Sequence, residues 1–143
     1  MPQRLGAEDG VERFVAPQEA TYATALAELR RGRKESHWMW WIFPQLKALG
    51  RSATAKAYGI ADLREAEAYL AHPVLGPRLV EAARAMLGHR GEDPAVVLGG
   101  IDAVKLRSCA TMFAAVPGAD PVFREVLDAF YGGEDDPLTL EAL

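Results

Sequence analysis

Residues 36–45 read Ser-His-Trp-Met-Trp-Trp-Ile-Phe-Pro-Gln and contain all three tryptophans of the chain. Large aromatic side chains bury more area per residue than others, so such a run forms either the centre of a core or the floor of a pocket. Polar residues stand at both ends of the run, with Ser36 and His37 before the aromatic residues and Gln45 after them. We therefore expect the rest of the chain to be organised around this segment.

The aromatic run is apolar nearly all round, so its periodicity does not separate a buried helix from a buried strand. We predict a helix, because the surrounding sequence is rich in Ala and Leu, and we assign Ser36 as its N-cap. Pro44 lacks a backbone donor, so the helix is expected to bend or break between Trp40 and Phe43 and to leave one or two carbonyl groups free. The predicted face of the helix consists of Trp38, Ile42, Leu46 and Leu49.

Length and composition narrow the class of protein. The chain has 143 residues, of which 50% are hydrophobic, enough for one domain with a sizeable core. Its 16 basic and 20 acidic residues give a net charge of -4, which argues against a duplex nucleic-acid ligand. One cysteine excludes an internal disulfide and suits the cytoplasm. There is neither an apolar signal segment nor a run of about 18 apolar residues, so no membrane span is expected.

Helix signals fill the remainder of the chain. Residues 1–9 are polar and are expected to be frayed, and residues 10–143 are expected to form a single domain. Gly32 predicts the end of a helix that begins after Pro17. Aspartate followed by proline is a helix start that occurs three times, at residues 93, 120 and 136. The predicted helices are Gln18–Arg31, a Ser52-capped helix through Tyr58, Leu63–Ala71, Val74–Leu87, 94–98, an Asp102-capped helix through Ala115, 121–131 and 137–142.

No segment alternates apolar and polar residues for long enough to predict a strand. The sequence therefore predicts an all-α domain of about seven to nine short helices separated by Pro and Gly turns. Leu106, Cys109, Ala110 and Phe113 are expected to form the buried stripe of the helix that precedes Pro117.

The motifs resemble those of a bacterial family catalogued as a domain of unknown function, number 1810. The resemblance rests first on residues 36–45, then on Gly50-Arg51-Ser52 and Tyr58-Gly59-Ile60. It continues through residues 68–76, Lys105-Leu106-Arg107-Ser108 and the closing segment from Phe130 to Leu140, and so spans nearly the whole chain. The chain departs from the family pattern at Pro17 and at Cys109-Ala110.

The resemblance implies an all-helical fold and implies no particular activity. Because serine is common at the position of Cys109 in the family, this cysteine is a poor candidate for a nucleophile. Family members are sometimes labelled calpastatin-like, but calpastatins are disordered and poor in aromatic residues. The tryptophan-rich run of this chain does not fit that label.

His37 is the candidate catalytic residue, because an imidazole titrates near neutral pH and can act as a general acid or base. The alternative is a histidine held in an aromatic cluster by a bond to the backbone. No partner carboxylate lies at helical spacing from it, so the sequence leaves both interpretations open.

Gly50-Arg51-Ser52 is the candidate anion site. A glycine lets a ligand approach the backbone, Arg51 offers two parallel donors, and Ser52 stands at a helix start. An ordinary capped helix is the alternative, and it is the commoner of the two. Lys105 and Ser108 lie three residues apart on one helix and are expected either to face the same anion or to form a solvated face with an Asp102–Lys105 ion pair.

Two functions are compatible with these residues. The first is binding of a small anionic or nucleotide-like ligand in an aromatic cleft, with Trp38 and Trp41 stacking on it and Gln45, Arg51, Ser52, Lys105 and Ser108 holding its polar groups. The second is a protein-interaction module in which the aromatic run is only core. Exposure separates them: the first requires Trp38, Trp41 and His37 to border a pocket, and Arg51 and Lys105 to share it. No metal-ligand spacing and no nucleotide loop is present, so no cofactor is assigned.

Overall fold

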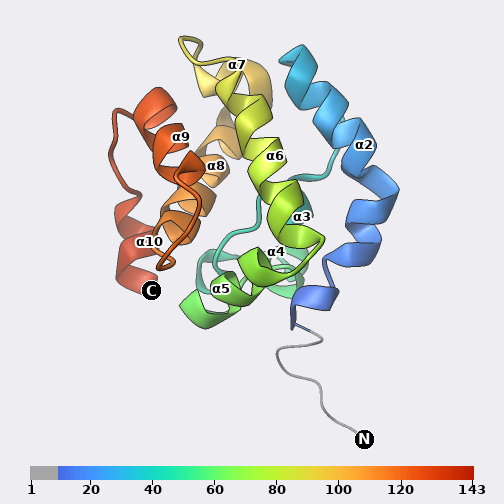
Figure 1. The fold of residues 1–143 in the computed structure, drawn as a ribbon, viewed down its shortest axis with the longest axis vertical. Helices are drawn as coiled ribbons and strands as arrows, with labels where there is room; N and C mark the ends of the chain where they lie inside the picture. Colours follow the sequence, from blue (N-terminus) through green and yellow to red (C-terminus); the bar gives the residue numbers. More distant parts are fainter. Residues whose placement is uncertain (1–9) are drawn as a thin grey trace, which may run out of the picture.

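The computed structural model describes residues 10–143, so the expectation for residues 1–9 lies outside the described part of the chain. Within residues 10–143 the fold is all-α and contains no strand, which confirms the predicted class. After a helical turn at residues 10–12, nine complete α-helices follow, together with one short 3-10 helix (Figure 1). They are α2 (Val15–Arg31), α3 (Met39–Ile42), η1 (Lys47–Leu49), α4 (Ala53–Ala57), α5 (Leu63–Ala71), α6 (Leu75–Leu87), α7 (Pro94–Leu98), α8 (Gly100–Ala114), α9 (Val122–Tyr131) and α10 (Pro137–Ala142).

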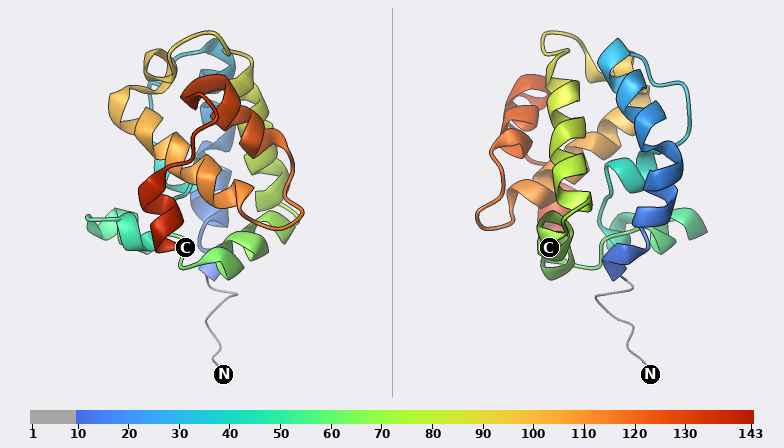
Figure 2. Two further views of the ribbon diagram at one scale, coloured as in Figure 1. Left: turned by 90° about the vertical axis from the view of Figure 1, so that its left-hand side faces the viewer. Right: turned by 45° about the vertical axis from the view of Figure 1, so that its right-hand side comes forward.

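Helix α6 occupies the middle of the fold, with α2 on one side and α9 on the other (Figure 1). Helix α8 packs against α9, α7, α5 and α10 and so joins the second half of the chain to the first. In Figure 2, α8 crosses behind α6 in the right-hand view, and α10 lies in front of α8 in the left-hand view. The segment between α3 and α5 lies at the same end of the molecule as α5 and carries α4 and η1.

A chain of aromatic contacts runs through the core. Phe14 meets Tyr69 of α5 with ring centroids 5.2 Å apart, and Tyr69 meets Phe113 of α8 at 5.4 Å. Phe113 in turn meets Phe123 of α9 at 5.5 Å. All four rings are buried, so these contacts tie the N-terminal turn to three later helices.

Most helix boundaries agree with the sequence because their capping residues act locally. Asp62 accepts a hydrogen bond from the Glu65 N–H, Asp93 from Ala95 and Asp136 from Thr139, and α5, α7 and α10 span the predicted residues. Gly32 ends α2 in the left-handed conformation, with φ of 83°. The predicted stripe of α8, from Leu106 to Phe113, is buried.

Two predicted helix starts are wrong. Helix α2 begins at Val15, so Pro17 does not interrupt it; proline is tolerated in the first turn, where the backbone N–H has no partner within the helix. Asp102 does not cap α8, which begins at Gly100; Asp102 lies in its first turn, where its carboxylate faces two lysines.

The predicted helix through the aromatic run is confirmed only between Met39 and Ile42. Pro44 breaks it as expected, and Phe43 leaves the helical region with φ of -124° and ψ of 74°. The carbonyl of Trp41 is one of the groups set free, and it accepts a hydrogen bond of 2.7 Å from the Gln18 side-chain amide. Because the chain is not helical beyond Ile42, the predicted common face with Leu46 and Leu49 does not exist.

Ser36 is not the N-cap of this helix. Its hydroxyl instead donates to the Glu28 carboxylate at 2.6 Å, and Trp38 stands at the cap position without a side-chain hydrogen bond. The carboxylate of Glu28 also accepts from the Ser36 and Glu35 backbone N–H groups and from the Trp38 indole. A buried carboxylate of α2, not a local cap, therefore holds the start of the aromatic run.

Candidate functional site

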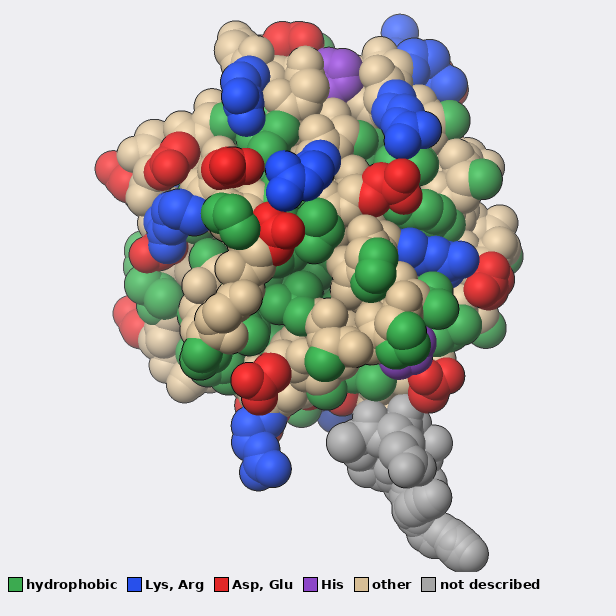
Figure 3. Space-filling model, viewed as in Figure 1, with side chains coloured by type: hydrophobic (Ala, Val, Ile, Leu, Met, Phe, Trp, Pro, Cys, Tyr) green, Lys and Arg blue, Asp and Glu red, His purple; other side chains and the backbone are tan. Residues whose placement is uncertain are grey.

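Two hollows on the surface merit comparison. The larger, here called the central groove, has a volume of about 940 Å³ and lies between α5, α6 and the α8–α9 loop (Figure 3). Its floor is apolar and includes Leu70, Val80 and Val116, and Gly76 allows α6 to approach the Leu70 backbone closely. The groove has no residue in common with the sequence-predicted site.

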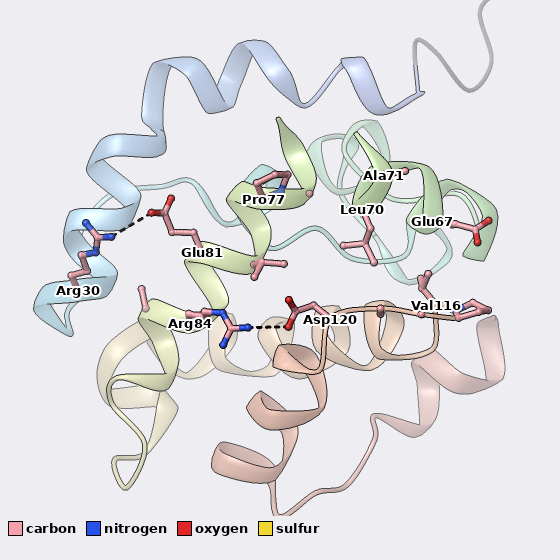
Figure 4. A pocket seen from close by; sticks show the side chains of 15 residues that line it. Arg30, Glu67, Leu70, Ala71, Pro77, Glu81, Arg84, Val116 and Asp120 are labelled. Carbon is pink, nitrogen blue, oxygen red and sulfur yellow. Dashed lines mark hydrogen bonds and ion pairs between the residues drawn. The ribbon is translucent and has the colours of Figure 1, made fainter. Parts of the chain in front are cut away.

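The charges around the central groove are mostly neutralised. Arg30 pairs with Glu81 at 3.4 Å, and Arg84 pairs with Asp120 at 3.1 Å (Figure 4). Both ion pairs are exposed to solvent, where such pairs contribute little energy. The groove thus offers an apolar surface and two satisfied ion pairs, which do not select a charged ligand.

The smaller hollow, here called the Trp40 pocket, has a volume of about 260 Å³. Three stretches of chain meet in it: the aromatic run, the segment from Gln45 to Tyr58, and the first half of α8. Its lining includes two cations, Arg51 and Lys105, and no acidic side chain. The lining residues are Trp40, Gln45, Leu46, Leu49, Gly50, Arg51, Ser52, Ala55, Tyr58 and Lys105.

A backbone bridge closes the segment that carries most of this pocket. The Lys47 N–H donates to the Ile60 carbonyl and the Ile60 N–H donates to the Gln45 carbonyl, both at 2.7 Å. Leu46 and Ile60 are buried at the bridge and anchor it to the core. Residues 45–60 thus form a closed loop, here called the pocket loop, with η1 and α4 packed together inside it.

Arg13 fastens the end of α4 to the rest of the molecule. Its guanidinium donates to the Ala57 carbonyl at 2.8 Å and to the Gly59 carbonyl, and it pairs with Glu65 at 3.1 Å. The Glu65 carboxylate also accepts from the Ala61 N–H at 2.8 Å. Long-range side-chain bonds therefore hold the C-terminal part of the pocket loop.

Gly59→Ala should destabilise the protein by about 1–3 kcal/mol, the usual range for overpacking. A Cβ at this position would lie 2.4 Å from the Lys47 Cα, and backbone cannot move away without breaking the bridge. Urea unfolding monitored by circular dichroism measures the change. Gly100→Ala is the control, since a Cβ there meets nothing within 4 Å; equal stability of the two variants would contradict the assigned contact.

Lys105 lies above the Trp40 ring, with its ammonium 3.7 Å from the ring centroid. The same ammonium is 3.6 Å from the Asp102 carboxylate, whose other oxygen is 3.0 Å from the Lys34 ammonium. The Lys34 side chain is only 9% exposed and also donates to the Ser36 carbonyl. Two ammonium groups therefore share one carboxylate, and an excess positive charge remains beside the pocket.

The family model described as "Protein of unknown function (DUF1810)" matches residues 8–143. The chain belongs to the DUF1810 family. The crystal structure of the conserved hypothetical protein Rv1873 from Mycobacterium tuberculosis is similar to it, with 43% sequence identity and a TM-score of 0.90 over 93% of this chain and 95% of that one. No curated protein matches the chain.

In this DUF1810 protein, four of the sequence-predicted ligand-binding residues meet in the Trp40 pocket: Gln45, Arg51, Ser52 and Lys105. Ser52 caps α4 through a hydrogen bond of 3.0 Å from the Ala55 N–H, as its position predicted. Lys105 forms the ion pair with Asp102 that was the alternative for this face, and it lines the pocket as well. Arg51 and Lys105 therefore share one cavity.

The structure of this DUF1810 chain places the other predicted residues elsewhere. Trp38 is completely buried, and its indole N–H donates to Glu28 at 2.9 Å. Trp41 is half-buried and donates to the Thr21 hydroxyl, with its ring packed edge-on against Tyr58. Ser108 is buried beneath α10, where its hydroxyl lies 2.7 Å from that of Thr139. These three side chains do not line the Trp40 pocket.

His37 is exposed and lines neither the central groove nor the Trp40 pocket. The predicted convergence of His37 with Arg51 and Lys105 is therefore not seen. Cys109 of the DUF1810 chain does not line the Trp40 pocket either. It is buried, and burial raises the pKa of its thiol and keeps it protonated, so it is not a nucleophile.

Three contributions to the site were not predicted from the sequence: Trp40, the pairing of Asp102 with Lys34, and Arg13. Trp40 is one of three tryptophans close together in the sequence, and the direction of each side chain depends on the break at Pro44. Asp102 and Arg13 act through contacts with distant segments, which no local pattern encodes. Within the described part of the DUF1810 chain, no three His, Cys, Asp or Glu side chains gather as metal ligands, and no helix there has the length and apolar character needed to span a membrane.

Proposed function

We propose that the protein binds a compact organic anion in the Trp40 pocket. The observation that carries the proposal is the meeting of Arg51 and Lys105 around a cavity whose lining includes no acidic side chain. Because Lys105 shares the single Asp102 carboxylate with Lys34, the charge of Arg51 and Lys105 at the pocket is not fully neutralised and favours an anion there. The Gln45 amide and the Ser52 hydroxyl supply uncharged donors to the same anion.

The size of the pocket supports a small ligand over a whole nucleotide. At about 260 Å³ it is slightly smaller than the roughly 300–1,000 Å³ of typical sites for drug-sized molecules. Trp40, Leu49 and Tyr58 offer an apolar wall for the carbon part of the ligand. A carboxylate or phosphate on a short carbon skeleton matches this combination of wall and charges.

The proposal is restricted to binding. The pocket lining contains no His, Cys, Asp or Glu, the residue types that most often transfer protons or attack as nucleophiles. We also infer a bacterial and cytoplasmic protein, because its structural relative comes from Mycobacterium tuberculosis and its single cysteine suits a reducing compartment.

NMR titration of the full chain with inorganic phosphate, citrate, benzoate and N-acetylglutamate tests the proposal. At least one of these anions should shift the Trp40 indole N–H and the Ser52 and Ala55 amide signals. Lys105→Met should weaken that binding about tenfold, because a charged hydrogen bond is worth about 1.5–3 kcal/mol and each 1.4 kcal/mol is a factor of ten.

Arg51→Ala should weaken the same binding by a similar factor, whereas His37→Ala should leave it unchanged because His37 lies outside the pocket. Thermal unfolding of each variant verifies that the fold is kept. Binding that is insensitive to both Lys105→Met and Arg51→Ala would show that the anion binds elsewhere and would overturn the proposal.

A further inference from the structure

Six large hydrophobic side chains of the described residues are exposed. They come from α7, α8 and α10 and from the residue that follows α10, while the remaining helices expose none. Ile101 is 76% exposed, Val104 68% and Leu138 63%. Contiguous exposed apolar surface on a folded domain marks an interaction site more often than a solvated face. The full set is Val96, Ile101, Val104, Leu138, Leu140 and Leu143.

Two of these helices, α8 and α10, adjoin the Trp40 pocket. Asp136 donates its N–H to the Thr111 hydroxyl, and one turn later Thr139 bonds to Ser108, so α10 packs across α8. Helix α10 also packs against η1, whose last residue, Leu49, lines the pocket (Figure 2, left).

Helical spacing along α8 leads to the same arrangement. Ile101 lies one turn before Lys105, and Val104 lies one turn before Ser108. Lys105 faces the pocket, and Ser108 is covered by α10. Ile101 and Val104 continue these two rows of side chains toward the start of α8, where both are exposed. We call Ile101 and Val104, which neighbour Lys105 on α8, the apolar face.

The combination of a cationic pocket and an adjoining apolar face restricts the class of ligand. A free metabolite would fill the pocket and leave the apolar face exposed to water. A nucleic acid would require a track of cations for successive phosphates, whereas the pocket is bordered by Ile, Val and Leu. A protein segment with one carboxylate among apolar residues is complementary to both parts.

We propose that the anion bound by the Trp40 pocket is a Glu or Asp side chain of a partner protein, whose neighbouring apolar residues cover the apolar face. This inference rests on the proposed function, because Arg51 and Lys105 provide the charge complementarity. The pocket fixes the position of the acidic side chain, and the apolar face supplies the buried area that a single carboxylate lacks.

The test uses NMR titration of the full chain with three probes. The first is a set of capped heptapeptides with a central Glu flanked by Leu and Val, the second is the same set with Gln in place of Glu, and the third is N-acetylglutamate N-methylamide. The Glu peptides are expected to bind at least tenfold more tightly than the single capped residue and at least tenfold more tightly than the Gln peptides.

The double variant Ile101→Ser/Val104→Ser should remove the gain of the peptides over the single residue and leave the affinity for the single residue unchanged. Both substitutions fall on exposed positions, so the fold should be kept. Lys105→Met should lower the affinity for both the Glu peptides and the single capped residue. Arg84→Ala in the central groove is the matched control and should change neither affinity.

The outcomes separate the two proposals. If the single residue binds and the peptides bind no more tightly, the partner proposal fails and the proposed anion pocket stands. If neither the peptides nor the single residue binds while inorganic phosphate or citrate does, or if peptide binding is unaffected by Lys105→Met, the partner proposal fails and the anion pocket is judged by its own test. A dimer in sedimentation velocity that dissociates in the Ile101→Ser/Val104→Ser variant would show that a second copy of the chain covers the apolar face, and would also overturn the partner proposal.

Discussion

Trp38→Ala should lower the free energy of unfolding by about 3–5 kcal/mol, the usual cost of truncating a large aromatic side chain in a core. Trp38 is completely buried, its ring lies 6.4 Å from that of Phe43, and the Lys34 ammonium is 5.0 Å from its ring centroid. Removing the Trp38 side chain would leave a cavity, and the Glu28 carboxylate would lose one of its hydrogen-bond donors. Urea unfolding at pH 7 measures the loss.

Two variants divide this effect into its parts. Trp38→Phe keeps most of the apolar volume and loses the indole N–H, so about 1–2 kcal/mol should be lost. Trp40→Ala removes a tryptophan that is only partly buried, and it should cost less than half as much as Trp38→Ala. A Trp38→Ala protein within 1 kcal/mol of the wild type would contradict the assignment of this residue to the core.

The second large effect is expected at Glu28, whose carboxylate is the acceptor of four hydrogen bonds. Glu28→Ala would leave the Trp38 indole and two backbone N–H groups without their acceptor, and each buried unsatisfied donor costs about 1–3 kcal/mol. We expect a total loss of about 3–5 kcal/mol in urea unfolding. Glu19→Ala, at an exposed ion pair on the same helix, is the control and should cost less than about 1 kcal/mol.

The stability that Glu28 provides should depend on pH. Burial alone would raise the pKa of its carboxyl group, but the hydrogen bonds from Ser36, Glu35 and Trp38 outweigh burial and lower the pKa from 4.5 to about 2. A carboxyl group with a lower pKa in the folded state binds its proton more readily when unfolded. Its contribution is therefore complete above about pH 4.5 and is lost as the pH falls from 4.5 toward 2.

Glu28→Gln tests this linkage without removing the side chain. The amide oxygen can still accept from the backbone and from Trp38, so the loss at pH 7 should be smaller than for Glu28→Ala, about 1–2 kcal/mol. Unfolding free energies at pH 7, 5, 4 and 3 should fall less steeply for this variant than for the wild type. Parallel curves for the two proteins between pH 5 and 3 would exclude Glu28 as a source of the acid sensitivity.

Local signals made most of the fold predictable from the sequence. Aspartate caps, Asp-Pro pairs and a closing glycine act on residues within one turn, so α5, α7, α10 and the end of α2 were found at their residues. The start of the aromatic run was not found. A segment that is apolar all round shows no helical or strand period, and its start is held by Glu28, which lies at least eight residues earlier in the chain.

The candidate site was predictable in part for the same reason. Arg51 and Lys105 stood out as cations within unusual motifs, and the structure brings them to one pocket. The sequence did not identify the tryptophan that borders the pocket, because this depends on the backbone geometry at the break near Pro44. Trp40 lines the pocket, whereas Trp38 and Trp41 were expected there. Pairing of Asp102 with Lys34 was beyond reach, because only the packed fold brings α7 and α8 beside residue 34.

The pocket loop is joined to the core by few bonds, chiefly the two at the Leu46–Ile60 bridge and those of Arg13. Segments of this kind open locally at a lower free energy than the whole molecule unfolds. Amide hydrogens of α4 should therefore exchange with solvent deuterium much faster than those of α6 and α8, while the Lys47 and Ile60 amides exchange slowly. A ligand that bridges Arg51 on the loop and Lys105 on α8 would join the two parts, and its binding would register as slower exchange along the loop.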